Sequence, residues 1–202
     1  MPPQTPIINT NLLNYLRKTS LRESDVQKEL RKITSKLPEA GWAVSPELGQ
    51  FLALIVQITG AESILEIGNF TGHSSLAMGL VLPNEGKIIT CDMEPKYTEI
   101  AQKYWIKAGI EHKIELRHGP ALTTLASLLT ELDAEYFDLA FIDANKKDYD
   151  AYYELTLKLI RPAGLIIIDN VFWGGKILDN GNTEKSTIAI RNLNKKLLAD
   201  KR

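Results

Sequence analysis

Residues 63–72 read SILEIGNFTG, and this stretch decides the fold. A short apolar run ends in a turn that contains Gly68 and Gly72, and an apolar segment of helical character follows, which predicts a strand, a tight turn and a helix. The turn lacks the third glycine of the G-x-G-x-x-G loop that holds the pyrophosphate of a dinucleotide. Glu66 adds a negative charge two residues before Gly68. The stretch therefore favours an amine-bearing ligand, an adenosyl amino acid, over a dinucleotide.

The sequence outside this stretch alternates between short apolar runs and amphipathic segments. Strands are predicted at residues 63–68, 87–92, 113–119, 137–144 and 164–170. Helices are predicted between and after them, at residues 74–82, 95–108, 121–132, 147–160 and 186–198. This alternation is typical of parallel strands joined by crossover helices. The strands are nearly continuous apolar runs, which suit burial on both faces of a sheet. The sequence therefore predicts a doubly wound, mostly parallel α/β sheet. Such sheets bind ligands beyond the carboxyl ends of their strands, so the functional side chains are expected there.

Residues 1–42 are predicted to form a helical segment that precedes the sheet. Apolar side chains from Val26 to Leu37 recur at spacings of four, three and four, and Ser24 stands before them as a helix cap. A further helix is expected to begin after Ser45, with a proline at its first position, and to end at Gly60.

Length and composition limit the class of protein. The chain has 202 residues, which predicts a single domain over residues 1–202, with its α/β body at 43–202. It has 24 Lys and Arg against 25 Asp and Glu, a formal net charge of -1, so no nucleic-acid partner is expected. No apolar run approaches the ~20 residues that span a bilayer, and the first ten residues lack the charged and apolar regions of a signal peptide. We therefore expect a cytoplasmic protein without a membrane anchor, with its single cysteine, Cys91, as a reduced thiol packed in a strand.

Carboxylate and amide side chains stand at the ends of three predicted strands. Asp92 ends the second strand, where nucleotide-binding α/β folds place the acid that accepts hydrogen bonds from the ribose hydroxyls, although a helix cap is the alternative role. Asp143 lies at the end of the fourth strand, and Asp169 with Asn170 lies at the end of the fifth. Their oxygen donors suit a hard divalent cation such as Mg²⁺. Capping of the following helices is the alternative role of the two aspartates.

Several motifs follow one another through the whole chain. They are Ser45-Pro46-Glu47, Leu65-Glu66-Ile67-Gly68 with Thr71-Gly72, Gly119-Pro120-Ala121-Leu122, Phe141-Ile142-Asp143-Ala144 with Lys146, and Asp169-Asn170 with Trp173. From about Leu12 onward the chain resembles the S-adenosylmethionine-dependent, cation-dependent O-methyltransferases of the caffeoyl-CoA and catechol type, in particular their bacterial members. The resemblance implies the Rossmann-like fold of class I methyltransferases.

The resemblance also implies roles for particular residues. The positions that hold S-adenosylmethionine in the family match Glu66, Gly68, Ser74, Asp92, Ala121 and Asp143. The three ligands of the divalent cation, Mg²⁺ ahead of Mn²⁺ or Ca²⁺, match Asp143, Asp169 and Asn170. Lys146 matches the general base, which would act together with Asp143 in catalysis. Trp173 matches an aromatic residue of the acceptor pocket.

The reaction that the resemblance implies is methyl transfer to a hydroxyl of a small aromatic, catechol-type acceptor chelated by the cation. The cation would lower the pKa of the bound phenol, Lys146 would accept the proton, and the phenolate would attack the methyl group directly. Relatives are commonly homodimers, and a homodimer is expected here. Relatives also continue into a final pair of strands, whereas this sequence ends at Arg202, so the sheet is expected to lack that pair.

Other functions stay open on the sequence alone. A transferase that methylates another nucleophile would use the cofactor residues but would leave the predicted cation ligands unexplained. An interaction protein that binds the cofactor without turnover would need a partner to cover the exposed edge of the sheet. An oxidoreductase ranks last, because the turn lacks the third glycine and carries Glu66.

Overall fold

The computed structural model describes residues 8–132 and 134–202, so residues 1–7 of the predicted helical segment lie outside the description. In chain order the helices and strands are α1 (Thr10–Ser20), α2 (Asp25–Thr34), α3 (Pro46–Thr59), β1 (Ser63–Ile67), α4 (His73–Val81), β2 (Lys87–Asp92), α5 (Pro95–Lys107), β3 (Ile114–His118), α6 (Ala121–Glu131), β4 (Phe137–Ile142), α7 (Tyr149–Leu159), β5 (Ile160–Ile168) and α8 (Lys185–Ala199). Short 3-10 helices are η1 (Ala40–Trp42), η2 (Glu111–Lys113), η3 (Lys146–Asp148) and η4 (Trp173–Leu178).

The strands form one sheet in the order β3-β2-β1-β4-β5, and each neighbouring pair is parallel. From β1 the chain first builds the sheet outward through β2 and β3, and it then returns to the other side of β1 to add β4 and β5. This order confirms the doubly wound α/β fold. Among the described residues no strand follows β5. The change of direction between β1 and β4 is the point at which such sheets open a ligand-binding crevice.

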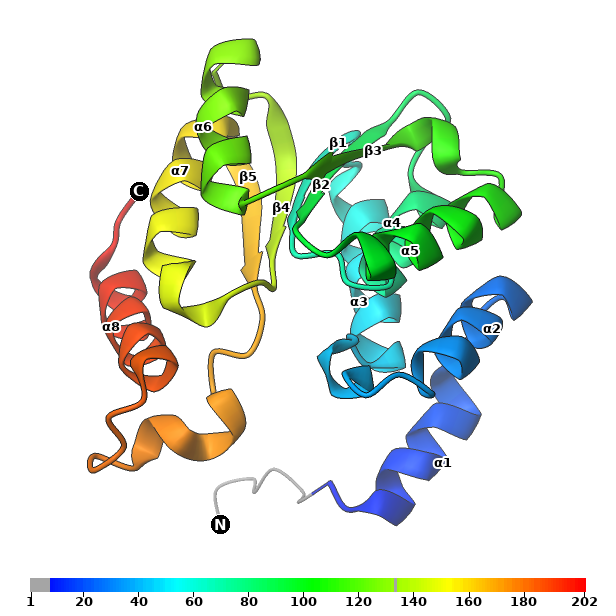
Figure 1. The fold of residues 1–202 in the computed structure, drawn as a ribbon, viewed down its shortest axis with the longest axis horizontal. Helices are drawn as coiled ribbons and strands as arrows, with labels where there is room; N and C mark the ends of the chain where they lie inside the picture. Colours follow the sequence, from blue (N-terminus) through cyan, green and yellow to red (C-terminus); the bar gives the residue numbers. More distant parts are fainter. Residues whose placement is uncertain (1–7, 133) are drawn as a thin grey trace.

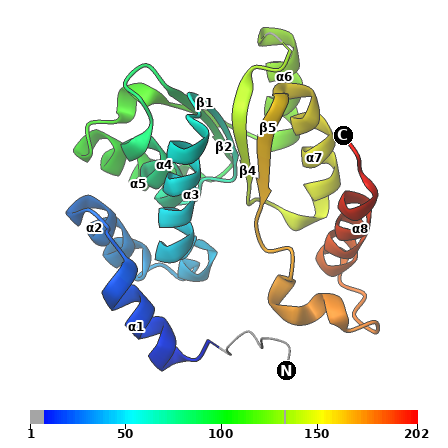
Figure 2. The same ribbon diagram turned by 180° about the vertical axis from the view of Figure 1, so that it is seen from behind.

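Helices cover both faces of the sheet, as Figure 1 and Figure 2 show. On one face α3 and α4 pack against Ile64 of β1 and Phe141 of β4. On the other face α6 and α7 pack against Leu65 and Ile67 of β1 and Ala140 of β4, and α8 packs against α7. Successive side chains of a strand point to opposite faces, so both faces of these central strands need apolar residues. This two-sided burial explains the nearly continuous apolar runs in the sequence.

The predicted helix caps form as expected. The Ser24 side chain accepts a hydrogen bond from the backbone N–H of Gln27, whose side chain binds back to the backbone of Ser24 in a capping box. The Ser45 side chain accepts a backbone N–H in the first turn of α3, and Pro46 occupies the first position of this helix. Gly60 ends α3 in the left-handed conformation, with φ of 63°.

Most boundaries lie within two residues of the sequence prediction, and two larger differences stand out. The residues before the Val26 to Leu37 stripe form a separate helix, α1, which contributes no buried side chain. The last strand, β5, begins at Ile160 instead of residue 164, because Ile160 pairs with Phe137 across an irregularity in the register. Arg161 and Pro162 interrupt the apolar pattern between Ile160 and the later isoleucines, so the sequence pattern alone located only the second half of the strand.

Cys91 lies in β2 with its side chain buried and its Sγ 3.4 Å from the carbonyl oxygen of Glu66. Burial raises the pKa of the Cys91 thiol to about 12, which keeps it protonated at neutral pH. The prediction of a packed thiol in a strand is confirmed. Across residues 8–132 and 134–202, no helix combines the length and the apolar character that crossing a bilayer requires.

Candidate active site

A cavity of about 870 Å³ lies beyond the carboxyl ends of the strands. The segments that follow all five strands contribute to its wall, together with residues around η1. Every site residue predicted from the sequence except Glu66 lines it: Gly68, Ser74, Asp92, Ala121, Asp143, Lys146, Asp169, Asn170 and Trp173. The parallel sheet thus brings together side chains that are more than a hundred residues apart in the sequence.

Gly68 makes the turn after β1 possible. Its φ of 93° lies in the left-handed region, and a Cβ at this position would stand 2.3 Å from the carbonyl oxygen of Asp143. Gly72, with φ of 83°, lies equally close to α5, since a Cβ there would stand 2.6 Å from the Cβ of Ala101. The two glycines therefore let the turn pass directly beside the end of β4 and the middle of α5.

Asp92 holds the backbone of this turn. Its Oδ2 accepts hydrogen bonds from the backbone N–H groups of Asn69 at 2.9 Å and Phe70 at 2.8 Å. Its Oδ1 accepts from the backbone N–H of Glu94 at 3.0 Å, just before α5. The alternative role as a helix cap is not observed, because Glu94 is the N-cap of α5 and no side chain caps that helix; the Asp92 carboxylate lines the cavity instead. Sequence analysis did not select Asn69 and Phe70, although their place directly after Gly68 was the available signal.

Glu66 lies behind the turn instead of facing the cavity. Its side chain is fully buried, and its Oε2 accepts hydrogen bonds from Thr90 Oγ1 at 2.6 Å and from Asn69 Nδ2 at 2.8 Å. Burial raises the pKa of Glu66, whereas hydrogen bonds from Ser74, Thr90 and Asn69 oppose that rise. Its Oε1 has no hydrogen-bond partner among the described residues. Glu66 therefore contacts the residues of the cavity wall and shapes the cavity through them.

Asp143 and Lys146 form an ion pair at the end of β4. Lys146 Nζ donates to Asp143 Oδ1 at 2.6 Å, and the two side chains are only 12% and 13% exposed. Burial raises the pKa of Asp143, the nearby Lys146 lowers it, and the negative charge of Asp169 raises it further. The influence of Asp169 on Asp143 follows from the pairing of β4 with β5, in which the backbone N–H of Asp169 donates to the carbonyl of Ile142 at 3.0 Å.

These residues fit a hard divalent cation. Asp143, Asp169 and Asn170 offer carboxylate and amide oxygens from adjacent strand ends in one cavity. Asn170 takes a left-handed conformation, with φ of 61°, which costs energy and is often found at functional sites. Within the described part of the chain no three His, Cys, Asp or Glu side chains form a metal cluster.

Aromatic side chains form two walls of the cavity. The Trp173 ring lies between two ammonium groups, with Lys146 Nζ at 5.9 Å and Lys176 Nζ at 6.0 Å from its centroid. On another part of the wall, Trp42 contacts Phe70 with ring centroids 5.7 Å apart, while Tyr97 lies 4.6 Å from Phe70. Flat apolar walls near polar strand ends suit a ligand that has an aromatic ring and polar substituents.

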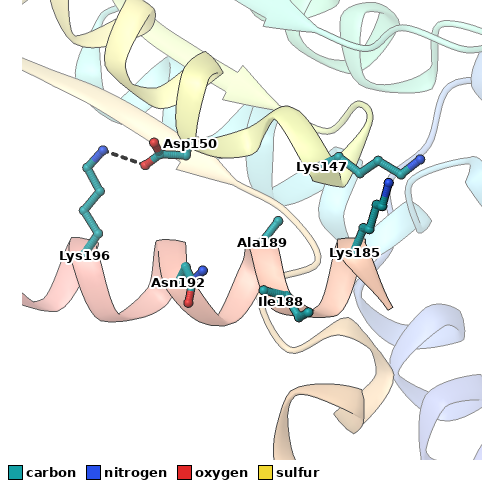
Figure 3. A pocket seen from close by; sticks show the side chains of 7 residues that line it. All are labelled: Lys147, Asp150, Lys185, Ile188, Ala189, Asn192 and Lys196. Atoms are coloured by element: carbon teal, nitrogen blue, oxygen red, sulfur yellow. Dashed lines mark hydrogen bonds and ion pairs between the residues drawn. The ribbon is translucent and has the colours of Figure 1, made fainter. Parts of the chain in front are cut away.

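A second, shallower groove of about 510 Å³ lies between the start of α7 and α8. Figure 3 shows Lys147 and Lys185 at one end of this groove, while Asp150 pairs with Lys196 at the other end. The Asp150–Lys196 ion pair measures 2.5 Å. No residue predicted to carry chemistry lines this groove. The cavity at the strand ends is therefore the candidate active site.

A solved structure shares this fold with a ligand bound. The crystal structure of an O-methyltransferase from Bacillus cereus in complex with SAH is similar, with a TM-score of 0.87 and 33% identity, covering 96% of this chain and 87% of that chain. The fold and the site together define a Rossmann-like, S-adenosylmethionine-dependent methyltransferase.

The sequence comparisons give the family within this class. A family model described as O-methyltransferase matches residues 17–202, and the chain belongs to this family. "Probable caffeoyl-CoA O-methyltransferase 2" of Dictyostelium discoideum is 44% identical over 196 residues, which cover 96% of this chain and 85% of the relative. "Catechol O-methyltransferase domain-containing protein 1" of Mus musculus is 36% identical over 202 residues, which cover 100% of this chain and 76% of the relative.

Proposed function

We propose that this O-methyltransferase transfers a methyl group from S-adenosylmethionine to a hydroxyl of a catechol-type aromatic acceptor. A divalent cation, Mg²⁺ before Mn²⁺ or Ca²⁺, would be held by Asp143, Asp169 and Asn170. The observation that carries the proposal is the placement of two carboxylates, an amide and Lys146 at adjacent strand ends, in the same cavity as the glycine turn. The printed names of the relatives, which refer to caffeoyl-CoA and catechol, support an acceptor of this class.

The cofactor half of the proposal assigns Asp92 and the turn to S-adenosylmethionine. A carboxylate has about four lone-pair positions, and the three backbone donors around Asp92 leave one for a ribose hydroxyl. Ser74 and Ala121 line the cavity in the first turns of α4 and α6, where helix N-termini favour negatively charged groups. Gly68 lets this turn pass beside Asp143 because it has no side chain. Glu66 would support these residues from behind through Asn69 and Ser74.

The chemical step needs little more than positioning and one proton acceptor. When bound, S-adenosylmethionine supplies an electrophilic methyl group on sulfonium, and a divalent cation lowers the pKa of a hydroxyl that coordinates it. Lys146 would receive the hydroxyl proton as the new oxygen–carbon bond forms and the carbon–sulfur bond breaks. Trp173 would hold the flat ring of the acceptor so that its oxygen faces the methyl group.

Removal of the cation and one pair of variants test the proposal. With catechol as acceptor, excess EDTA is expected to abolish methyl transfer, and added Mg²⁺ should restore it. Asp143→Asn is expected to lower kcat at least a hundredfold while calorimetry still detects binding of S-adenosylhomocysteine. Asp150→Asn is the matched control, because it removes a carboxylate that pairs with Lys196 outside the cavity. Full activity in excess EDTA would refute the role of the cation.

The partners and location predicted from the sequence belong to the same proposal. The acceptor would be a small aromatic molecule with a free hydroxyl, since the cavity of about 870 Å³ has the size of a small-molecule site. The homodimer and the cytoplasmic location stay predictions, as does the single domain over residues 1–202.

A further inference from the structure

Thr34 is a buried threonine of α2 whose hydrogen bonds run to a distant part of the chain. It is the last residue of this helix and is 2% exposed. Thr59, the last residue of α3, donates its hydroxyl to the carbonyl of Ile55 in its own helix at 2.8 Å. The Thr34 hydroxyl instead bonds to Thr71 and His73, which flank the first residue before α4. It therefore links the N-terminal helices to the turn after β1.

A single oxygen makes both of these contacts. Thr34 Oγ1 lies 2.9 Å from Thr71 Oγ1 and 3.2 Å from His73 Nε2. Burial lowers the pKa of His73 to about 4, so its imidazole is neutral at pH 7 and has one N–H and one acceptor nitrogen. The Thr34 hydroxyl can thus donate to one neighbour and accept from the other, in either order. Removal of this one hydroxyl breaks both hydrogen bonds.

The two bonds hold the second half of the turn after β1. Asp92 holds the first half, because it accepts from the backbone N–H groups of residues 69–70. Thr71 and His73 come next, both are buried, and both contribute to the cavity wall. Ser74, which is assigned to the cofactor, directly follows His73. A shift of Thr71 and His73 would therefore change the wall at which the cofactor binds.

The position of Thr34 is fixed by apolar packing of α2 against the body of the fold. Leu30 lies four residues before Thr34, so it shares the same face of the helix. It is 0% exposed and belongs to a core cluster with Leu76 of α4 and Trp105 of α5. Thr34 is not among the described residues that line the cavity. Its effect on a ligand in the cavity must pass through Thr71 and His73.

We propose that Thr34 is a positioning residue that holds Thr71 and His73 so that the turn after β1 keeps the shape that binds S-adenosylmethionine. The inference rests on the proposed function, because it takes this turn as part of the cofactor site. It gives α2, which supplies none of the residues assigned to the cofactor, a part in setting the affinity for that cofactor.

Binding of S-adenosylhomocysteine to the full chain, measured by calorimetry, tests this role without turnover. Thr34→Val keeps the volume of the side chain and replaces the hydroxyl with a methyl group. It is expected to weaken binding about tenfold, as the loss of one or two ordinary hydrogen bonds would. Thr34→Ser keeps the hydroxyl and loses the methyl group, and it should bind almost as tightly as the wild type. In kinetics, the KM for S-adenosylmethionine should rise in Thr34→Val more than kcat falls.

Thr156→Val is the matched control for the loss of a buried hydroxyl. Thr156 is 0% exposed in α7, and its hydroxyl has no hydrogen-bond partner among the described residues, so this variant should leave the affinity unchanged. Wild-type affinity in Thr34→Val overturns the inference and leaves the proposed function intact. Binding by Thr34→Ser that is as weak as binding by Thr34→Val, or weaker, also overturns it, because the affinity then follows packing and not the hydroxyl.

Folding of each variant is checked by circular dichroism. If Thr34→Val does not fold, Thr34→Ser and Thr34→Ala give the same comparison, because their side chains differ by the hydroxyl alone. Tighter binding by Thr34→Ser supports the inference, and equal affinities of these two variants overturn it. A wild type that binds no S-adenosylhomocysteine refutes the cofactor site and the inference together.

Discussion

Gly68 is the residue at which backbone geometry and active-site geometry meet. A Cβ at this position would lie 2.3 Å from the carbonyl oxygen of Asp143, and its φ of 93° is unfavourable for any other residue. Gly68→Ala is therefore expected to lower the free energy of unfolding by about 3 kcal/mol or more and to weaken binding of S-adenosylhomocysteine. Urea denaturation and calorimetry measure the two effects.

Gly60→Ala provides the control for this prediction. Gly60 also has a positive φ, 63°, but no atom lies within 4 Å of the position its Cβ would take. Gly60→Ala should lower the free energy of unfolding by only about 1 kcal/mol, which is the cost of the left-handed backbone for a residue with a side chain. It should leave ligand binding unchanged. If Gly68→Ala and Gly60→Ala lower the free energy of unfolding and the ligand affinity equally, the close approach of residue 68 to Asp143 does not limit the side chain at that position.

Those site residues that lie at the ends of strands were predictable from the sequence. Asp92, Asp143 and Asp169 follow apolar runs that end at one edge of a parallel sheet, so their presence in one cavity follows from the fold. Glu66 was not predictable in the same way, because its burial depends on the packing of the turn over β2.

Asp138 connects three strands at the end of the sheet opposite the cavity. Its Oδ2 accepts from the backbone N–H groups of Glu62 at 2.8 Å and Ser63 at 2.9 Å, and its Oδ1 accepts from Arg161 Nε at 2.6 Å. It therefore joins β4, which contains it, to the start of β1 and to β5. Burial opposes ionisation of this carboxyl, but the hydrogen bonds from Arg161, Glu62 and Ser63 prevail and lower the pKa of Asp138 to about 2.

This lowered pKa predicts an acid-dependent loss of stability. The ionised form is favoured in the folded state, so its contribution is complete above the unfolded pKa near 4 and disappears as the pH falls toward 2. The contribution is about 2 kcal/mol. Asp138→Asn should lower the unfolding free energy at pH 7 and show a smaller decrease between pH 5 and pH 2 than the wild type, measured by urea denaturation.

Asp25→Asn is the comparison for this acid profile. Asp25 is exposed on α2, and among the described residues it pairs only with Lys28 at 3.1 Å, a contact that contributes little in water. Asp25→Asn should therefore show the same dependence of the unfolding free energy on pH as the wild type. If Asp138→Asn shows the same pH dependence of the unfolding free energy as the wild type, the hydrogen bonds to Asp138 do not stabilise its ionised carboxylate.

At the scale of elements, the sequence predicted each strand and crossover helix of the sheet, since apolar period and caps are local signals. It placed the start of β5 four residues late. Pairing with β4 extends that strand through Arg161 and Pro162, and such pairing is a tertiary contact that local patterns do not contain. It also treated α1 and α2 as one segment, because α1 has no buried face to create a strong pattern.

For the molecule as a whole, binding of S-adenosylhomocysteine where the chain changes direction between β1 and β4 should stabilise the entire sheet against unfolding. S-adenosylhomocysteine at about a hundred times its dissociation constant adds about 2.7 kcal/mol to the unfolding free energy. For a chain of this length the melting temperature should rise by roughly 5–10 °C, measured by differential scanning fluorimetry. Asp92→Ala removes the acceptor that holds the turn, so it should show a much smaller shift at the same ligand concentration. An equal shift would contradict the assignment of Asp92 to the cofactor site.

The sequence by itself determined the alternation of strands and helices, the doubly wound class of the fold and the acidic strand ends, because these depend on local apolar periodicity, on caps and on the rule that parallel strands end at one edge. Only the tertiary structure decided the strand order, which side chains line the cavity and which lie behind it. Glu66 and Asp92 illustrate the difference: both are carboxylates beside the same turn, yet one is enclosed under it and the other faces the cavity. That outcome depends on packing between segments far apart in the chain, where the cost of burying a charge is offset only by the particular donors that the fold brings to it.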